Sequence, residues 1–277
     1  MLVPRTHPRQ TPRPRRTRQG YDALIGVDRL EGTPLRIHTI MHVPFEGAGE
    51  MSAWAEARGH AMSEGLALLE TFPPVGEVDL LLVMGGPMAA DDEAHHPWLA
   101  AEKRYIADAI EDGALVLGVC LGAQIIADVL GGTVRRNPHR EIGFWPVHRA
   151  AGAAGDPVFG AFPRELVVGH WHGDTFDLPG AAQPALSSEA TANQAFSARG
   201  GRVVGLQFHL EWSEEGLRTL ALECADELEA GGEWVTPAPD MLEEAEEYLP
   251  VCREELFALL DRLAARMLPD SERPSRA

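Results

Sequence analysis

Residues 114–132 read ALVLGVCLGAQIIADVLGG, and this stretch decides the fold. Its first six residues are apolar, which is typical of a strand buried on both faces of a parallel sheet. A helix-like run starts directly after Cys120, and glycines at positions 118 and 122 permit a sharp turn between the two elements. Strand, cysteine turn and helix in this order have the sequence form of a nucleophile elbow. The stretch therefore predicts an α/β fold in which Cys120 is lifted out of the sheet.

The segments upstream of this stretch alternate in the same way. Apolar strand patterns and helical patterns take turns before it, and this order predicts a parallel α/β sheet. After Gly132 the segments become short and rich in β-forming residues, which predicts a mixed or antiparallel extension of that sheet. The predicted elements are strands at 35–41, 79–88 and 114–119, helices at 50–59 and 97–113, and extension strands at 141–150, 165–173, 182–190, 193–198 and 202–212. The fold class expected is a three-layer α/β sandwich with a mixed, largely parallel central sheet of flavodoxin-like type.

The two ends of the chain differ from this body. Residues 1–33 combine Pro and Arg without apolar periodicity, so we expect a disordered tail, with a basic recruitment arm as the alternative. Amphipathic helices are predicted at 212–232, with Ser213 as N-cap, and at 250–268. The acidic run at 240–249 is interpreted as a solvated helix face, with partner docking as the alternative. The expected division is a tail at 1–33, a catalytic domain at 34–230 and a helical extension at 231–277.

Composition restricts the class of protein. The formal net charge is −18, and six Arg fall within residues 1–20, so the body is more acidic still and nucleic acid is disfavoured as a partner on electrostatic grounds. The longest apolar stretch is interrupted by Gln124 and Asp128, and no membrane span or apolar signal region is predicted. Three scattered cysteines favour neither a disulfide framework nor a zinc site. We therefore expect a cytoplasmic protein.

A cysteine at a helix start needs more than its position to react. The helix dipole favours a thiolate by only ~1 kcal/mol, so a nearby base is required, and an inert buried cysteine is the alternative. The segment GLQFHLEW supplies one, because His209 and Glu211 share one side of an extended chain. A carboxylate beside an imidazole fixes its tautomer and stabilises its charged form. Alone, this pair is typical of a surface contact; after a cysteine elbow it predicts a catalytic triad.

Four motifs, GVCLGAQ, MGGPM, HWHGD and LQFHLE, occur between residues 35 and 212. Together they resemble the class I glutamine amidotransferase family, in particular stand-alone proteins similar to the amidotransferase domain of GMP synthase, and also the γ-glutamyl peptidases of that superfamily. The resemblance implies that Cys120 is the nucleophile, His209 the general base and acid, and Glu211 the residue that orients His209. Where the family usually has Pro between the His and the Glu, this chain has Leu210. Ala123 stands where His or Met often precedes the family's Gln, which affects specificity more than catalysis.

The resemblance also implies a set of substrate-binding residues. Backbone N–H groups of Gly86 and Leu121 match the oxyanion-hole donors, and Gln124 matches the residue that helps to hold the amino-acid end of the substrate. The loop that holds the same end is matched at Trp171, Gly173 and Asp174, with Met88 as a weaker positional match. No cofactor and no metal are expected.

These residues imply hydrolysis of a γ-glutamyl amide through a thioester on Cys120. Three functions stay open: an amidotransferase that hands ammonia from glutamine to a separate synthetase partner, a hydrolase of γ-glutamyl peptides such as glutathione conjugates, and a binding protein that has lost catalysis. The 65 residues after Trp212 are too few for a synthetase domain, so we expect the acceptor to be another protein.

The remaining histidines and cysteines are interpreted as structural. His95, His96, His170 and His172 lack acidic residues at metal-ligand spacing and are expected to be turn or loop histidines. Cys224 and Cys252 lie at apolar helix positions and are expected to be core residues.

Overall fold

A ten-stranded sheet forms the centre of the part of the chain that the structure describes, residues 34–267 of this computed structural model. The predicted tail at 1–33 lies outside the described residues. The strands are β1 (Arg36–Met41), β2 (Ala61–Leu66), β3 (Leu80–Val83), β4 (Leu115–Val119), β5 (Thr133–Arg149), β6 (Glu165–Asp177), β7 (Gln183–Ser187), β8 (Ala195–Ala198), β9 (Val203–Leu206) and β10 (Trp234–Val235).

Strand pairing divides this sheet into two halves. Along the order β2-β1-β3-β4-β9 all neighbours are parallel, as the alternation of strands and helices predicts. From β9 the sheet continues through antiparallel β8, β7 and β5, and β6 pairs antiparallel with β5. The predicted antiparallel extension is therefore confirmed. Strand β4, which ends at the cysteine turn, lies inside the parallel half, between β3 and β9.

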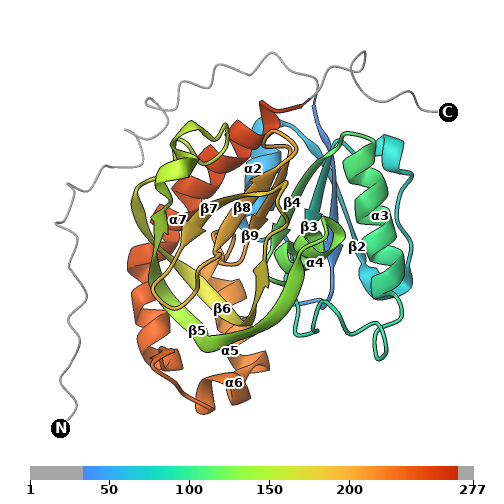
Figure 1. Ribbon diagram of the computed structural model, residues 1–277. Helices are drawn as coiled ribbons and strands as arrows, with labels where there is room; N and C mark the ends of the chain where they lie inside the picture. The colour runs from blue at the N-terminus through green and yellow to red at the C-terminus, as the bar shows by residue number, and fades with distance from the viewer. Residues whose placement is uncertain (1–33, 268–277) are drawn as a thin grey trace, which may run out of the picture. The chain divides into compact units, whose positions relative to one another are not determined.

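Helices cover both faces of the sheet, which gives three layers (Figure 1). On β3 the side chains alternate, so that Leu80 and Leu82 pack into one apolar cluster and Leu81 and Val83 into another. The first cluster contains residues of α2 (Glu50–Arg58) and α7 (Ala238–Ala264); the second contains residues of α3 (Leu99–Glu111) and α4 (Leu121–Val129). These contacts confirm the predicted α/β sandwich with a mixed sheet.

The C-terminal helices differ in part from the sequence prediction. Ser213 caps α5 (Glu214–Glu223) as expected, because its hydroxyl accepts a hydrogen bond from the Gly216 N–H at 3.0 Å. The helix breaks at Cys224 and resumes as the short α6 (Ala225–Glu229). The predicted helix at 250–268 starts too late: the acidic run and this segment form one helix, α7, with the exposed Pro250 inside it. Burial of Met241 and Ala245 on the acidic run explains why the helix continues through a proline.

Two edge strands were not predicted, and both have sequences without a strand pattern. Strand β2 reads AMSEGL and is largely exposed at the edge of the sheet, where polar residues discourage pairing with other chains. Strand β10 is only two residues long and pairs with β5. Three short 3₁₀ turns complete the described elements, at Ala67–Leu69, Val75–Glu77 and Ala151–Gly155.

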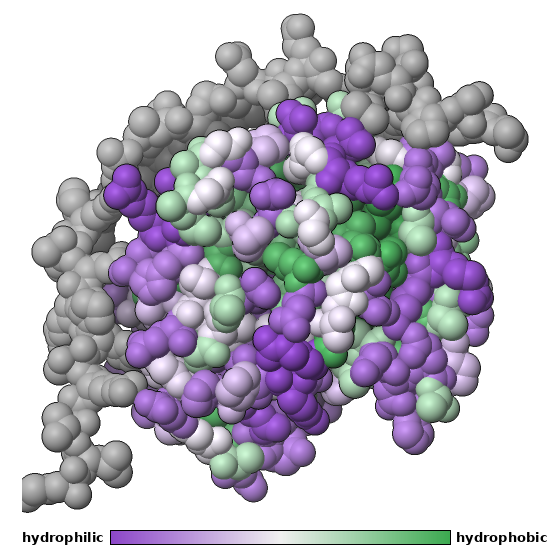
Figure 2. Space-filling model, in the orientation of Figure 1, coloured by the Kyte–Doolittle hydropathy of each residue, from purple (hydrophilic) through white to green (hydrophobic). Residues whose placement is uncertain are grey.

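Polar residues cover most of the face seen in Figure 2, with apolar surface confined to smaller areas between them. Exposed large apolar side chains in the described residues are Leu68, Leu69, Leu222 and Val251. No helix of residues 34–267 has both the length and the hydropathy needed to cross a bilayer.

Candidate active site

Cys120 forms the tip of a strained turn between β4 and α4. Its φ of 52° and ψ of −109° lie outside the regions that a residue with a side chain normally adopts, and this conformation lifts the sulfur out of the sheet. The neighbouring glycines are required: a Cβ on Gly118 would lie 2.5 Å from the backbone of Gly122, and one on Gly122 would overlap the Val83 carbonyl. Gly118 and Gly122 thus allow the first turn of α4 to pack directly against the ends of strands β3 and β4.

His209 lies on the segment that follows β9, and its position is fixed from two sides. Its backbone N–H donates to the Gly169 carbonyl on β6 at 2.7 Å, and its carbonyl accepts from the Gly169 N–H at 3.2 Å. The imidazole stacks on Trp212, with ring centroids 4.3 Å apart and planes 15° apart. Only Nε2 remains for chemistry, since in the described residues this buried nitrogen has no hydrogen-bond partner.

Glu211 orients the imidazole. The His209 Nδ1–H donates to Glu211 Oε1 at 2.7 Å, and both side chains are almost fully buried. The second oxygen, Oε2, accepts from the Leu210 N–H at 3.1 Å. Proline, which usually stands at this position in the family that the motifs resemble, has no N–H to donate. The Leu210 N–H therefore gives the Glu211 carboxylate a hydrogen bond that proline could not give. The side chains of His209 and Glu211 still meet.

Charge in this buried pair is set by opposing effects. Burial by itself would lower the pKa of His209, but the Glu211 carboxylate and the Cys120 sulfur together outweigh burial and raise this pKa to about 10. Burial raises the pKa of the Cys120 thiol, while the neighbouring His209 and a hydrogen bond from the Leu121 N–H lower it. The imidazolium is thus the charge that stabilises the thiolate once the sulfur loses its proton.

A cavity of about 100 Å³ opens over the sulfur. Every substrate-binding residue that the resemblance implied lines it: Gly86, Met88, Leu121, Gln124, Trp171, Gly173 and Asp174. The Cys120 sulfhydryl donates to the Trp171 carbonyl at 3.4 Å. The roles of these residues stay predictions, but the structure brings all of them to one cavity from the β3 turn, α4 and β6.

Several residues at or beside the cavity were missed by sequence reasoning. Gln207, two residues before His209, accepts from the Gln124 amide at 3.2 Å and donates to the Cys120 sulfur at 3.7 Å. Glu46, on the β1–α2 loop, lines the cavity with no motif to mark it. Arg136 and Arg140 on β5 also line it, and they pair with Asp174 at 3.3 Å and with Glu227 at 3.8 Å.

Cys224 corrects a prediction. It was expected in the core, but it is only partly buried and lines the cavity, because α5 ends there and turns towards the active site. Burial, followed by the carboxylates of Glu227 and Glu46, raises its pKa to about 11. Cys252 is buried as predicted, and its pKa is raised to about 12, mainly by burial.

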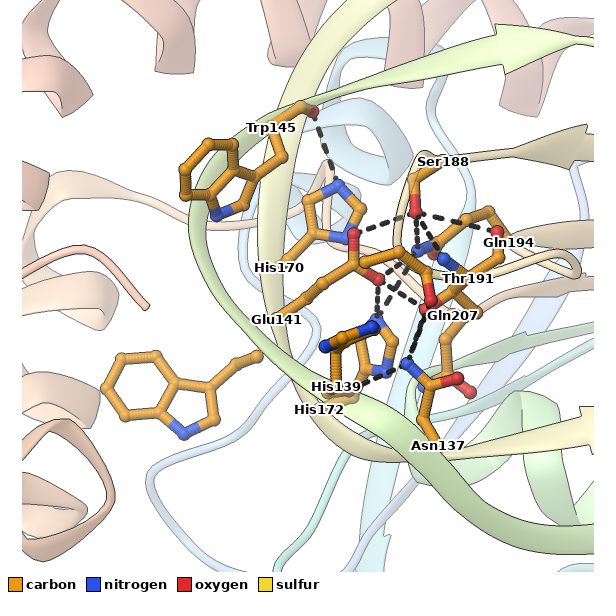
Figure 3. Close-up of polar contacts among 12 residues, drawn as sticks. Asn137, His139, Glu141, Trp145, His170, His172, Ser188, Thr191, Gln194 and Gln207 are labelled. Atoms are coloured by element: carbon orange, nitrogen blue, oxygen red, sulfur yellow. Dashed lines mark hydrogen bonds and ion pairs between the residues drawn. The ribbon is translucent and has the colours of Figure 1, made fainter. Parts of the chain in front are cut away.

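One group of side chains in residues 34–267 has the composition of a metal site. Figure 3 shows the Glu141 carboxylate between His170 and His172, and the three candidate ligand atoms lie within 4.8 Å of one another. The expectation that His170 and His172 are turn or loop histidines was wrong, because both lie on strand β6. No acid stands at metal-ligand spacing in the sequence, but Glu141 reaches them from the neighbouring strand β5.

Hydrogen bonds already satisfy this carboxylate. Thr191 Oγ1, Ser188 Oγ at 2.7 Å and Gln194 Nε2 at 2.8 Å all donate to it, and His172 Nε2 lies 3.2 Å away. Burial opposes ionisation, but the nearby histidines and hydroxyl groups lower the pKa of Glu141 to about 2. The arrangement fits a polar network that fixes His172, and with it the cavity-lining segment 171–174.

Comparisons with known proteins identify the family of this chain. The family described as glutamine amidotransferase class-I matches residues 66–223. The glutamine amidotransferase-like protein YfeJ of Salmonella typhimurium is 34% identical over 199 residues, which cover 70% of this chain and 83% of that protein. One subunit of a glutamine-hydrolysing GMP synthase from Saccharolobus solfataricus is 31% identical over 150 residues, 52% of this chain and 76% of that relative.

A solved structure extends the likeness to the fold. The glutamine amidotransferase from Thermotoga maritima superposes with a TM-score of 0.76 at 32% identity, covering 84% of this chain and 99% of that one. Because the family match spans more than half of the sequence and the similarity to YfeJ covers most of that protein, this chain belongs to the class I glutamine amidotransferase family.

Proposed function

We propose that this protein hydrolyses the γ-glutamyl amide of glutamine through a triad of Cys120, His209 and Glu211. The observation that carries the proposal is a strained cysteine that lines a small cavity and interacts with a histidine whose Nδ1 is bound to a carboxylate at 2.7 Å. This is the arrangement that activates a thiol nucleophile.

The chemical steps follow from these positions. The Cys120 thiolate attacks the carboxamide carbon, and the carbonyl oxygen becomes an oxyanion held by the N–H groups of Gly86 and Leu121. Each such donor contributes about 3 kcal/mol to the transition state. The imidazolium of His209 gives its proton to the nitrogen that leaves as ammonia, and a γ-glutamyl thioester remains on sulfur. Water that loses a proton to the same imidazole then cleaves the thioester and releases glutamate.

The size of the cavity favours a compact substrate. Pockets for drug-sized ligands are typically about 300–1,000 Å³, several times the volume found here. In our proposal Gln124 and the segment with Trp171, Gly173 and Asp174 hold the amino-acid end of the substrate, and Met88 closes the side of the oxyanion turn.

We infer that ammonia passes to a separate acceptor protein. The support is the likeness to part of a GMP synthase whose name states that it hydrolyses glutamine. The acidic face of α7 is the candidate docking surface on this chain.

A second function is favoured by one observation. Two guanidinium groups, of Arg136 and Arg140, stand at the cavity, and Arg136 is largely exposed. A leaving group that carries a carboxylate, as in a γ-glutamyl dipeptide, would meet these charges. The alternative is therefore a γ-glutamyl peptide hydrolase.

Steady-state kinetics separates the two. The purified protein is assayed with glutamine and with a panel of γ-glutamyl dipeptides, alongside Cys120→Ala and a pull-down for a synthetase partner. We expect weak hydrolysis of glutamine that rises when the partner is added. A kcat/KM for dipeptides larger by about 100-fold, or ~2.7 kcal/mol of transition-state binding, would establish the peptidase instead.

A further inference from the structure

A second glutamate–histidine pair lies beside the oxyanion turn, apart from the triad. His42 directly follows β1, and its Nε2 lies 3.0 Å from Glu102 Oε1 on α3. Its other ring nitrogen, Nδ1, lies 3.0 Å from the carbonyl oxygen of Gly85. Both side chains are 0% exposed. The pair therefore connects helix α3 to the backbone of the Gly-Gly-Pro turn.

The surroundings of His42 define its protonation. Both ring nitrogens face acceptor oxygens, so a proton on each nitrogen satisfies both contacts. Burial would lower the pKa of His42, but Glu102 outweighs burial and the pKa is raised. Within residues 34–267 the His42 ring is the one hydrogen-bond and ion-pair partner of the Glu102 side chain.

The contact with Gly85 acts on the next residue through one peptide unit. A peptide is planar and trans, so its carbonyl and its N–H point in opposite directions. The Gly85 carbonyl and the Gly86 N–H belong to the same unit. Because His42 holds the carbonyl on one side, the N–H is directed to the other side, where Gly86 lines the cavity above Cys120. In the described residues this N–H donates to no other backbone acceptor.

Packing holds the turn in this orientation. A Cβ on Gly86 would lie 2.7 Å from His42 Cβ and 3.1 Å from Leu121 Cδ2, so the turn runs directly between the two side chains. Leu121 supplies the other oxyanion donor. The Gly86 turn and the Leu121 side chain thus pack directly against each other, and this contact helps to hold both donors in place.

We propose that His42 and Glu102 form a positioning pair that orients the Gly85–Gly86 peptide and polarises it, so that the Gly86 N–H is a stronger donor to the oxyanion. This inference rests on the proposed function, because it needs a reaction with an oxyanion. A positive charge at the carbonyl end of a peptide draws electron density from the N–H at its other end, and preorganised donors of this kind contribute chiefly in the transition state.

The test removes the charge and keeps the geometry. In Glu102→Gln, a neutral His42 can still donate from Nδ1 to Gly85 and accept from the introduced amide. We expect kcat/KM for glutamine to fall about 10-fold with little change in KM, because only transition-state stabilisation is lost. Affinity for the γ-aldehyde analogue of glutamine, which adds to the thiol and forms an oxyanion, should fall by the same factor. Affinity for the product glutamate should not change.

Two further variants complete the experiment. Glu111→Gln on the same helix, where the carboxylate pairs with Arg199 at the surface, is the matched control and should behave as the wild type. The double variant His42→Asn with Glu102→Gln keeps an N–H near Gly85 without a buried charge, and should lose aldehyde affinity to a similar extent even if the single variant fails to fold.

The outcomes are distinguishable. Wild-type aldehyde affinity and kcat/KM in folded Glu102→Gln, or parallel losses of aldehyde and glutamate binding, would overturn the positioning pair. A wild-type protein that neither hydrolyses γ-glutamyl amides nor binds the aldehyde would overturn the proposed function itself.

Discussion

The three cysteines of the chain differ more in their neighbours than in their burial. Cys120 has an imidazole and a backbone N–H beside its sulfur, and both favour the thiolate. Cys224 lies at the same cavity but faces carboxylates, which oppose it. Cys252 is enclosed by apolar residues of the sheet–helix interface. Residue type alone therefore does not assign reactivity; the charges within reach of the sulfur do.

Cys120 should react first with a diazo-ketone analogue of glutamine. Of the three thiols, Cys120 is the one that an imidazole assists in forming a thiolate, and we expect its labelling to be at least about 10-fold faster than that of Cys224. Peptide mapping by mass spectrometry measures both rates in one sample. Cys120→Ala should abolish turnover and leave the melting temperature nearly unchanged, while Cys224→Ser should stay active. Preferential labelling of Cys224 would contradict the assignment of the nucleophile.

Glu211→Gln should change the pH profile as well as the rate. The carboxylate raises the pKa of His209 to about 10, so its removal lowers that pKa, and the imidazolium loses its proton at lower pH. The alkaline limb of kcat/KM should therefore shift to lower pH, with a fall in rate of about 100-fold, smaller than that of His209→Ala. An unshifted limb, measured from about pH 6 to about pH 10.5, would argue against an orienting carboxylate.

At the scale of elements, strand β6 and its partner β5 build one wall of the site. Glu141 on β5 holds His172 on β6, next to the residues that line the cavity (Figure 3). This contact could not be read from the sequence, because it joins distant positions whose pairing depends on the register of two long strands. The proposed triad could be predicted, because its members follow apolar strands with glycines or a paired acid beside them.

In three other places the local sequence pattern predicts the wrong secondary structure or burial. Strand β2 has no apolar alternation, since an edge strand is stabilised by its ladder rather than by a buried face. Pro250 predicts a helix start, but tertiary packing of Met241 and Ala245 continues α7 through it. Cys224 fits an apolar helix position, yet the helix ends there and exposes the thiol to the cavity. Each miss reflects a contact distant in sequence that overrides a local preference.

Glu141→Gln should destabilise the fold and weaken substrate binding. The introduced amide turns one acceptor into a donor that faces other donors, at a cost of about 2–4 kcal/mol, and it loosens His172 and the segment after it. Urea unfolding and KM for glutamine measure the two effects. The control is Glu165→Gln on β6, where the carboxylate pairs with His148 at the surface. A variant with wild-type KM would show that the network does not position segment 171–174.

For the whole molecule, buried titratable groups set the response to acid. Burial is the main cause that lowers the pKa of His170 to about 4, so the folded protein keeps it neutral while the unfolded chain binds a proton below about 6.5. The depressed pKa of Glu141, about 2, acts in the same direction at lower pH. The stability that these two groups contribute at neutral pH is lost as the pH falls through this range, whereas Glu244, whose pKa burial raises to about 7, acts in the opposite direction between about pH 7 and about pH 4.5.

The titration of His170 should by itself lower the free energy of unfolding by about 3 kcal/mol between about pH 6.5 and about pH 4. Urea unfolding at a series of pH values measures the slope. In His170→Gln an amide N–H can replace the contact of Nε2 with the Trp145 carbonyl. Over this window the wild type should lose about 3 kcal/mol of stability relative to this variant. An equal slope in both proteins would assign the acid response to other groups.

The backbone bridge between Gly169 and His209 also affects the thermal motion of the site. The same strand, β6, offers its Trp171 carbonyl to the sulfur and its Gly169 backbone to the histidine. We therefore expect a displacement of β6 to move Cys120 and His209 in the same direction. The distance between these two residues should then change less than the position of the strand itself. In the proposed function, thermal motion of β6 first disturbs the contacts with the substrate, because residues 171–174 of this strand line the cavity. We accordingly expect heating, well below unfolding, to raise KM before it reduces the reactivity of Cys120 towards a small alkylating agent.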